Sequence, residues 1–526
     1  MAVSGTMRSD MRPDMRSDLR SDARSDPAPV TGRVSSPPAR LLHEEVLEPQ
    51  FRYEVRRLLP HYVRIEKALL VAYERMRVLS APECDQLARA LTEAAGSITA
   101  DPAENFSDIA LSLEIETHRR APVPRWHVDR SRNDLQACAQ LMYGRERLLA
   151  SAEAVAGTAA AARDLARRHL RDVMPGFTHL QAAQVVTPGF YISALSSHLL
   201  QGLEGLLSVY DALDRCPLAA GAMSGQELPW PRDLLATLLG FAVPEPHALV
   251  AVASRDWVLA LAAQCSTLGV GLSRFVTDLM AWAGSGHAFL ELPDELAGIS
   301  SAMPQKKNYP VLERIRGRSG HLAGWYADVV AAQRNTPFSN TVEVSKEGSR
   351  GLTQALDDLD SLCRLLTAVL DAAVFRTDRM RELCEREFLG GFSLANRLAL
   401  EEGIPWRTAQ VVAGRYITAA LEAGRQPMDT DPAALARIGH EAGHPISDPI
   451  AVLEGVFDPV ADLLRKLTPG SAHPDAVQAM LDEQDAMAAS LEKAWEFRRV
   501  TVEAALSALD AMPDRPARVP TGVPGR

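Results

Sequence analysis

The chain has 526 residues, of which 47% are apolar, 23% charged and 6% aromatic. It carries 56 Lys and Arg against 67 Asp and Glu, so its formal net charge is -11 and no overall positive field favours nucleic acid or an anionic membrane as a partner. This composition excludes a disordered, collagen-like or membrane-spanning chain and predicts a folded, water-soluble protein with a well-buried core.

The six cysteines are spread along the chain without a CxxC pair or a Cys/His cluster at zinc spacing. No uninterrupted apolar run reaches the roughly 18 residues of a membrane span, and the N-terminal segment lacks the apolar core of a signal peptide. We therefore expect a cytoplasmic, reducing location and no structural metal.

Residues 1–40 form a low-complexity segment in which Arg and Asp alternate, each recurring every four positions from Arg8 to Asp26. Pro13 and Pro27 interrupt this pattern, and too few apolar side chains are present to bury anything. The segment is predicted to be a disordered, solvated tail. Residues 512–526, rich in Pro, Gly and Arg, are predicted to be a second loose end.

Between these tails, long Ala- and Leu-rich segments with hardly any strict alternation predict an all-α protein. The clearest helix covers residues 255–283, about 29 residues and about 43 Å long. Its apolar residues recur at spacings of three and four: Val258, Leu261, Cys265, Leu268, Leu272, Phe275 and Leu279. This seam is typical of a left-handed bundle, in which Gly269 and Gly271 would allow close approach of neighbouring helices. Its length favours a bundle shared between subunits.

Similar patterns predict further helices over residues 141–171, 188–213, 305–332 and 352–374. We divide the body into an N-terminal domain over 41–120, a central long-helix bundle over 121–376 and a C-terminal helical domain over 377–511. Prolines interrupt the last of these domains at several points.

Trp126 to Asp134, WHVDRSRND, is the first of three polar stretches that could carry chemistry. The guanidinium groups of Arg130 and Arg132 and the amide of Asn133 suit carboxylate ligands. The alternative is that both arginines form surface salt bridges near a helix start, where Asp134 is an N-terminal acid.

The second stretch, PGFTHLQAAQ, begins at Pro175 and carries Thr178 and His179 after a turn. A histidine of near-neutral pKa can transfer a proton, and a neighbouring hydroxyl can bind a carboxylate. A purely structural histidine is the alternative.

The third stretch, GISSAMPQKKNYPVLERIRG, covers residues 298–317 and lacks helical or strand periodicity up to about Pro310, as functional loops often do. A serine there could abstract a proton only if nearby cations stabilised its alkoxide, and Lys306 lies six residues after Ser300. Alternatively, Lys306 and Lys307 are ordinary solvated charges.

Together the three stretches supply carboxylate binders, a proton-transfer pair and an electrostatic clamp. These groups suit β-elimination, in which loss of a proton beside a carboxylate builds a doubly charged intermediate. No GxGxxG, GxxxxGK[ST], HExxH or GxSxG pattern indicates a nucleotide, metal or hydrolase site instead.

From about residue 50 to 480 the sequence resembles the argininosuccinate lyase family of the fumarase/aspartase superfamily. WHVDRSRND resembles the family's HT(G/A)RSRND, GFTHLQAAQ its GYTHLQ(x)AQ, and SSAMPQKKN its SSxMPQKKN. The resemblance implies a long-helix bundle with smaller N- and C-terminal helical domains, in a homotetramer whose active sites each draw on three subunits. It implies a small-molecule substrate and no organic cofactor or metal.

The resemblance also implies roles for single residues. Ser300 would be the catalytic base, with Ser301 as the alternative. His179 would take part in proton transfer, oriented by Glu313, while Lys306 and Asn308 would stabilise the intermediate. The other residues expected at the substrate, by their match to the family's motifs, are Arg132, Asn133, Thr178, Ser301, Asp108 and Lys346.

Departures from the family's pattern gather where the amine side of its substrate would be handled. They are Ala110, Val128, Asp129, Tyr309, Pro310, Phe338 and Glu343. The family's NSxDAVSDRD segment reads HALVAVASRD and keeps only Arg255 and Asp256 of its polar end, and no counterpart of DIxxSxAHA is recognisable. We therefore expect release of fumarate from argininosuccinate or a close analogue. The alternatives are another N- or β-substituted succinate, or a non-catalytic structural homologue.

Overall fold

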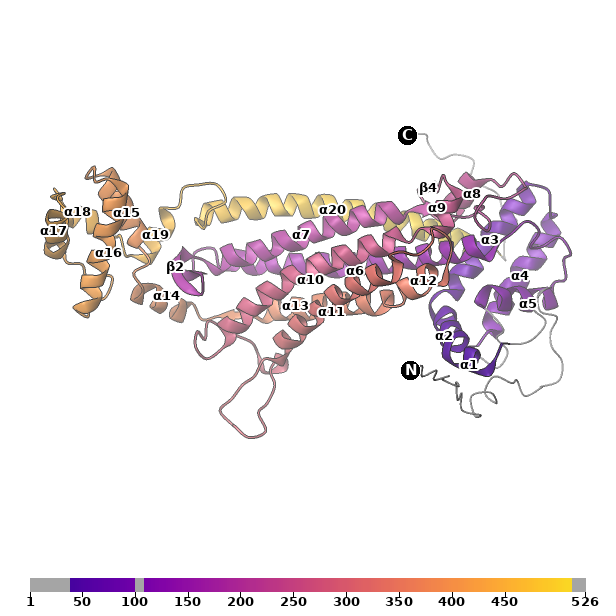
Figure 1. Cartoon of the computed structure of the whole chain (residues 1–526), viewed down its shortest axis with the longest axis horizontal. Coiled ribbons are helices and arrows are strands. Elements are labelled where there is room, and N and C mark those ends of the chain that lie inside the picture. The colour runs from indigo at the N-terminus through magenta and orange to yellow at the C-terminus, as the bar shows by residue number, and fades with distance from the viewer. Residues whose placement is uncertain (1–37, 100–107, 513–526) are drawn as a thin grey trace, which may run out of the picture.

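The computed structural model describes residues 38–99 and 108–512, so the two predicted tails lie almost entirely outside the described residues. A long bundle of helices occupies the middle of the molecule, with a smaller helical group at each end (Figure 1). The all-α fold predicted from the sequence is confirmed.

The N-terminal group consists of short helices that lead into the bundle: α1 (Arg40–Leu42), the π-helix η2 (His43–Leu47), α2 (Glu48–Arg57), α3 (Leu59–Arg75), α4 (Ala81–Ser97) and α5 (Ile109–Arg120). Local sequence explains where they begin. Ser80 and Glu83 form a capping box at α4, and the carboxylate of Asp108 caps α5 by accepting a hydrogen bond from the Leu111 amide.

Five long helices build the bundle: α6 (Arg132–Arg168), α7 (Pro188–Leu213), α10 (Asp256–Ala283), α11 (Pro310–Gln333) and α13 (Leu352–Ala372). Each was predicted, but two begin elsewhere. Helix α6 begins at Arg132 rather than at residue 141, because the Ser131 hydroxyl caps it by accepting a hydrogen bond from the Asn133 amide (3.2 Å). Helix α11 begins only at Pro310, which suits a first helical turn.

Short elements connect the long helices. The helical ones are α8 (Arg232–Leu238), α9 (Ala248–Ala253), η4 (Asp294–Leu296), α12 (Val342–Ser345) and η5 (Glu347–Ser349). The strands are β1 (Met174–Thr178), β2 (Gln181–Val186), β3 (Arg215–Cys216), β4 (Val243–Pro244), β5 (Leu290–Glu291) and β6 (Val374–Phe375). They form three two-stranded sheets: β1 with β2 and β5 with β6 antiparallel, and β3 with β4 parallel.

Helix α10 packs against α7 and α11 through the predicted seam, which is fully buried from Val258 to Leu272. Farther along, Val276 is fully buried, and Phe275 is partly buried and packs against the same core. Helix α10 is the one described helix long and apolar enough to cross a membrane. Within the single chain, 39% of its most apolar window is buried, in a helix that packs against α7 and α11.

At Gly269, helices α10 and α11 pack too closely to leave room for a side chain. A Cβ atom at this position would lie 2.8 Å from the Ser319 carbonyl oxygen and 3.0 Å from Leu322. Gly269→Ala is therefore expected to lower the free energy of unfolding by about 1–3 kcal/mol, because the helices must move apart. Thermal unfolding checks this, with Gly414→Ala as the control, since its Cβ would meet nothing within 4 Å. An unchanged midpoint for Gly269→Ala would contradict the tight contact.

The C-terminal lobe contains α14 (Thr377–Arg386), α15 (Gly391–Leu400), α16 (Trp406–Glu422), α17 (Pro432–Glu441), α18 (Pro449–Leu453) and α19 (Pro459–Leu464). Most of it packs around a separate core that includes Leu398, Val412 and Phe457. The predicted domain over 377–511 differs from the structure in its last part. Helix α20 (Pro474–Asp510) leaves the lobe and returns along α7 and α6 (Figure 1), where Leu481 and Trp495 join the core of the bundle.

Candidate active site

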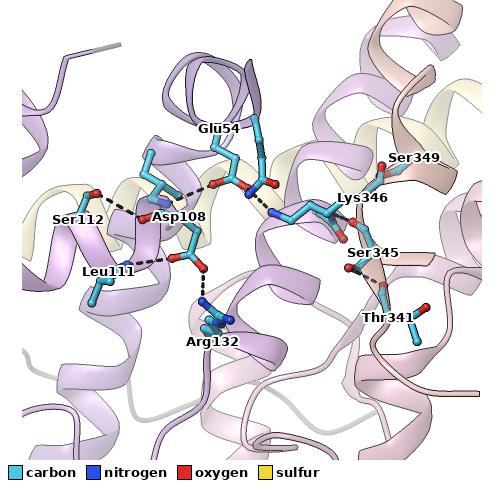
Figure 2. A network of polar contacts seen from close by, with 12 residues as sticks. Glu54, Asp108, Leu111, Ser112, Arg132, Thr341, Ser345, Lys346 and Ser349 are labelled. Carbon is cyan, nitrogen blue, oxygen red and sulfur yellow. Dashed lines mark hydrogen bonds and ion pairs between the residues drawn. The ribbon is translucent and has the colours of Figure 1, made fainter. Parts of the chain in front are cut away.

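Arg132 and Asp108 meet where the N-terminal group joins the bundle (Figure 2). Arg132 is the first residue of α6, and its Nη1 lies 3.1 Å from Oδ2 of Asp108. The other oxygen of Asp108 accepts the Leu111 amide at 3.1 Å, so the helix cap fixes the carboxylate. In this structure the Asp108 carboxylate therefore accepts hydrogen bonds from Arg132 and from the Leu111 amide.

Lys346 lies beside this pair and forms an ion pair with Glu54 of α2 (Figure 2). Glu54 is only 1% exposed, and it also accepts hydrogen bonds from the Ile109 amide (3.2 Å) and Gln50 (3.0 Å). Because Ile109 directly follows Asp108, the predicted substrate residues Asp108 and Lys346 belong to one polar network, which is joined through Glu54. A cavity of about 280 Å³ opens next to Lys346 and is lined in part by Glu54, Gln140 and Arg350.

Glu54 was not identified from the sequence, although a signal was present. It lies three residues after Phe51 and four before Leu58, both buried, so a carboxylate occupies the apolar face of α2. A charge at such a position requires a partner, which here is Lys346.

Asn133 contacts a loop, residues 217–231, that was not identified from the sequence. Its Nδ2 donates to the Ala222 carbonyl oxygen at 3.1 Å. The next residue, Asp134, is buried and accepts the Gly221 amide at 3.1 Å. Burial raises the pKa of Asp134 to about 7, against the opposing effect of the backbone amides and of Arg130. The two side chains hold this loop against the first turn of α6.

The environments of Arg130 and His127 indicate structural roles. Arg130 forms a buried ion pair with Glu66 of α3, both side chains being at most 5% exposed. Burial lowers the pKa of His127 to about 2, with a further contribution from Arg130, so this ring is neutral. Both arginines of the stretch are therefore paired, as the salt-bridge alternative predicted, but only Arg132 is exposed.

Thr178 and His179 lie at the far end of α6, on the hairpin of β1 and β2. Thr178 pairs with Gln181, and the two residues between them, His179 and Leu180, have φ values of 51° and 62°. These values are typical of a type I′ turn, which usually requires Asn or Gly. The turn exposes both side chains, and such strain is common at functional sites.

Ser300, Ser301, Lys306 and Asn308 lie on the irregular loop between η4 and α11. A bridge between Gly298 and Asn308 closes its base, with N–O distances of 2.8 and 3.1 Å. Within the loop, the Ser300 hydroxyl accepts a hydrogen bond from the Met303 amide at 3.1 Å. The side chain of Lys307 forms an ion pair with the exposed Asp294 (2.8 Å), which fits the alternative of an ordinary surface charge.

Glu313 is exposed on the first turn of α11. In the part of the chain that the structure describes, no hydrogen bond or ion pair joins it to His179. Its predicted orienting role therefore remains a prediction.

A single chain keeps the predicted residues in separate places. Helix α6, 37 residues and about 55 Å long, lies between Asn133 and His179, and the Ser300 loop projects from the side of the bundle (Figure 1). Among the described residues, no group of three or more His, Cys, Asp or Glu is placed to hold a metal ion. The predicted carboxylate-binding residues Arg132 and Asn133 therefore lie at one end of α6, and the predicted proton-transfer residues His179 and Ser300 lie on an exposed turn and a loop.

Comparison with known proteins identifies the family to which a chain with these residues belongs. Residues 86–324 match the family described as Lyase. The argininosuccinate lyase of Moorella thermoacetica is 34% identical over 64% of this chain and 72% of the relative. That of Methanothermobacter thermautotrophicus is 30% identical over 70% and 78%. The chain belongs to the argininosuccinate lyase family.

Solved structures of other proteins are similar in fold to this argininosuccinate lyase family member. EDDS lyase in complex with formate has a TM-score of 0.81 at 24% identity, covering 89% of this chain and 95% of the other. A class II fumarase from Schistosoma mansoni has a TM-score of 0.61 at 15% identity, covering 79% and 92%.

Membership of the argininosuccinate lyase family makes the protein a carbon–nitrogen lyase that yields fumarate. Members of the family act on small molecules, and the superfamily is generally tetrameric. The expected reaction class is thereby confirmed, while the leaving amine is a separate question.

Proposed function

We propose that this protein cleaves the C–N bond of argininosuccinate, or of a close N-substituted aspartate, to give fumarate and the amine. The similarity to argininosuccinate lyases of several organisms supports this substrate most directly. The display of His179 and Ser300 on an exposed turn and an irregular loop supports a role in catalysis rather than in packing.

In the proposed mechanism, Ser300 removes the proton next to a substrate carboxylate. The resulting intermediate carries two negative charges on that carboxylate, and Lys306 and Asn308 stabilise it. The C–N bond then breaks, its electron pair leaves with the nitrogen, and His179, oriented by Glu313, takes part in proton transfer. Arg132, Asn133, Thr178 and Lys346 hold the carboxylates of the substrate.

We further propose that the active site forms between subunits of a homotetramer. The separation of Asn133 from His179 by the full length of α6 supports this, because one chain cannot bring both to a small substrate. Exposed apolar side chains such as Val270 on the outer face of α10 support a further packing surface on the bundle.

A second candidate is cleavage of a different N-substituted aspartate. The departures from the family pattern favour it, since Val128, Phe338 and Glu343 are all exposed where a substrate could meet them. Exchanged polar contacts in a binding site alter discrimination strongly, because a missing partner leaves a desolvated group unpaired.

The test is fumarate release, followed by ultraviolet absorbance, from argininosuccinate, EDDS, adenylosuccinate, aspartate and malate. Turnover of argininosuccinate well above all others would support the first candidate. Turnover of another N-substituted aspartate alone would support the second. Silence across the whole panel would contradict both.

A further inference from the structure

Arg255 is a buried cation that none of the roles above uses. It precedes α10 as its N-cap residue and is 2% exposed. Its Nη1 donates to the carbonyl oxygens of Val252 (3.1 Å) and Ser254 (2.7 Å), and its Nη2 is buried without a hydrogen-bond partner. Within the described residues no carboxylate pairs with it, and burial lowers its pKa to about 10.

One path of hydrogen bonds leads from Arg255 to Lys346. The Nε of Arg255 donates to Oε1 of Gln140 on α6 at 2.9 Å. The amide nitrogen of Gln140 then donates to the Ser345 carbonyl oxygen at 2.6 Å. Ser345 is buried and directly precedes Lys346, so this path fixes the backbone from which the Lys346 side chain extends.

A second path starts from the backbone of the same residue. The carbonyl oxygen of Arg255 accepts a hydrogen bond from Gln333, at the end of α11, at 3.5 Å. Gln333 packs on Gly348, where an added Cβ atom would lie 3.1 Å from its side chain. Both paths end in residues 342–349, on either side of Lys346.

We propose that the side chain of Arg255 positions Lys346 by acting through Gln140, while the backbone carbonyl oxygen of the same residue holds Gln333 against the same segment. The proposal rests on the proposed function, in which Lys346 holds a substrate carboxylate opposite its Glu54 partner. It deepens that function by assigning the positioning of a substrate-binding lysine to a residue that touches no substrate.

Packing alone does not account for a guanidinium at this position. A buried charge without a counterion costs stability, which an apolar side chain of similar volume would avoid. Only a planar group with several donors can bond to Gln140 and to the two carbonyl oxygens at once. The arrangement therefore serves orientation at some expense in stability.

The direct test is Arg255→Gln. Because substitution of this buried residue can prevent folding, Gln140→Met provides a second variant, on a partly exposed side chain. We expect Gln140→Met to raise KM about tenfold and to change kcat less than about threefold, since Lys346 holds the substrate before and during reaction. In a Lys346→Met background the same substitution is expected to change kcat/KM less than about twofold. Gln140→Glu keeps an acceptor for Arg255 but loses the donor to Ser345, so it is expected not to restore KM.

Gln484→Met is the matched control, because Gln484 on α20 also donates from a partly buried amide to a backbone carbonyl oxygen, that of Ser193 (3.1 Å). Its KM is expected to match the wild type. Hydrogen exchange supplies a readout independent of catalysis: residues 341–350 should lose protection in Gln140→Met, while residues 256–283 keep theirs.

Equal losses of kcat/KM with and without Lys346 would overturn the proposal, as would unchanged exchange over residues 341–350. A wild-type protein that releases no fumarate from any compound would instead contradict the proposed function. Loss of protection confined to residues 341–350 in Arg255→Gln as well as in Gln140→Met would in that case still support Arg255 as the residue that positions Lys346.

Discussion

The Ser300→Ala protein is expected to lose kcat by about 10²–10⁴-fold while its oligomeric state stays that of the wild type. General-base removal has an effect of this size. Among the described residues, the hydroxyl of Ser300 bonds only within its own loop, to the Met303 amide, so its loss is expected to leave the packed bundle unaltered. Fumarate absorbance measures turnover, and light scattering after size exclusion measures assembly.

Ser301→Ala is the matched control, because Ser301 is exposed on the same loop. We expect it to keep most of its turnover. If Ser301→Ala is inactive and Ser300→Ala active, the base is Ser301. If both variants turn over at the wild-type rate, neither serine abstracts the proton, and the assignment of this loop to proton removal is wrong.

Two inactive variants produced together are expected to recover activity. Asn133→Ala and His179→Ala affect residues at opposite ends of α6, which a small substrate can contact together only if different subunits supply them. With equal expression and random assembly, a given site receives an intact Asn133 and an intact His179 in about one quarter of cases. Co-expression should therefore restore about a quarter of the wild-type kcat per site.

Thr178→Ala combined with His179→Ala is the control pair. These residues are adjacent on one hairpin, so no subunit of the mixture carries both intact, and no recovery is expected. Recovery by this pair, or none by the first pair, would contradict a site assembled between subunits.

The long helices α6, α7, α10, α11 and α13 could be predicted because each carries a complete local pattern, whereas α20, of 37 residues, was not predicted. The apolar spacing from Val258 to Leu272 and Pro188 at a first turn needed no knowledge of the rest of the chain. The hairpin of β1 and β2 was missed as a pair of strands for a physical reason. Its strands are five and six residues long, and its turn of His179 and Leu180 lacks the Asn-Gly that normally marks a type I′ turn.

The candidate site was predictable only where a motif is contiguous. His179 and Ser300 stand within stretches that are unusual by themselves. Glu54 and Gln140 do not stand in such stretches. Their roles depend on Lys346 and Arg255, which lie more than a hundred residues away. The one local sign of Glu54, a carboxylate between Phe51 and Leu58, indicates a buried partner without indicating which one.

Helix α20 also bears on how the protein is made. The ion pair between Arg64 and Asp510 joins residues 446 positions apart, and Trp495 and Leu509 complete a core begun by the first helices. During synthesis, the apolar side chains of α6 and α7 that α20 covers stay open to water until nearly the whole chain has left the ribosome. Premature termination before residue 474 would leave that face uncovered, so truncated chains should be ready targets for chaperones and proteases.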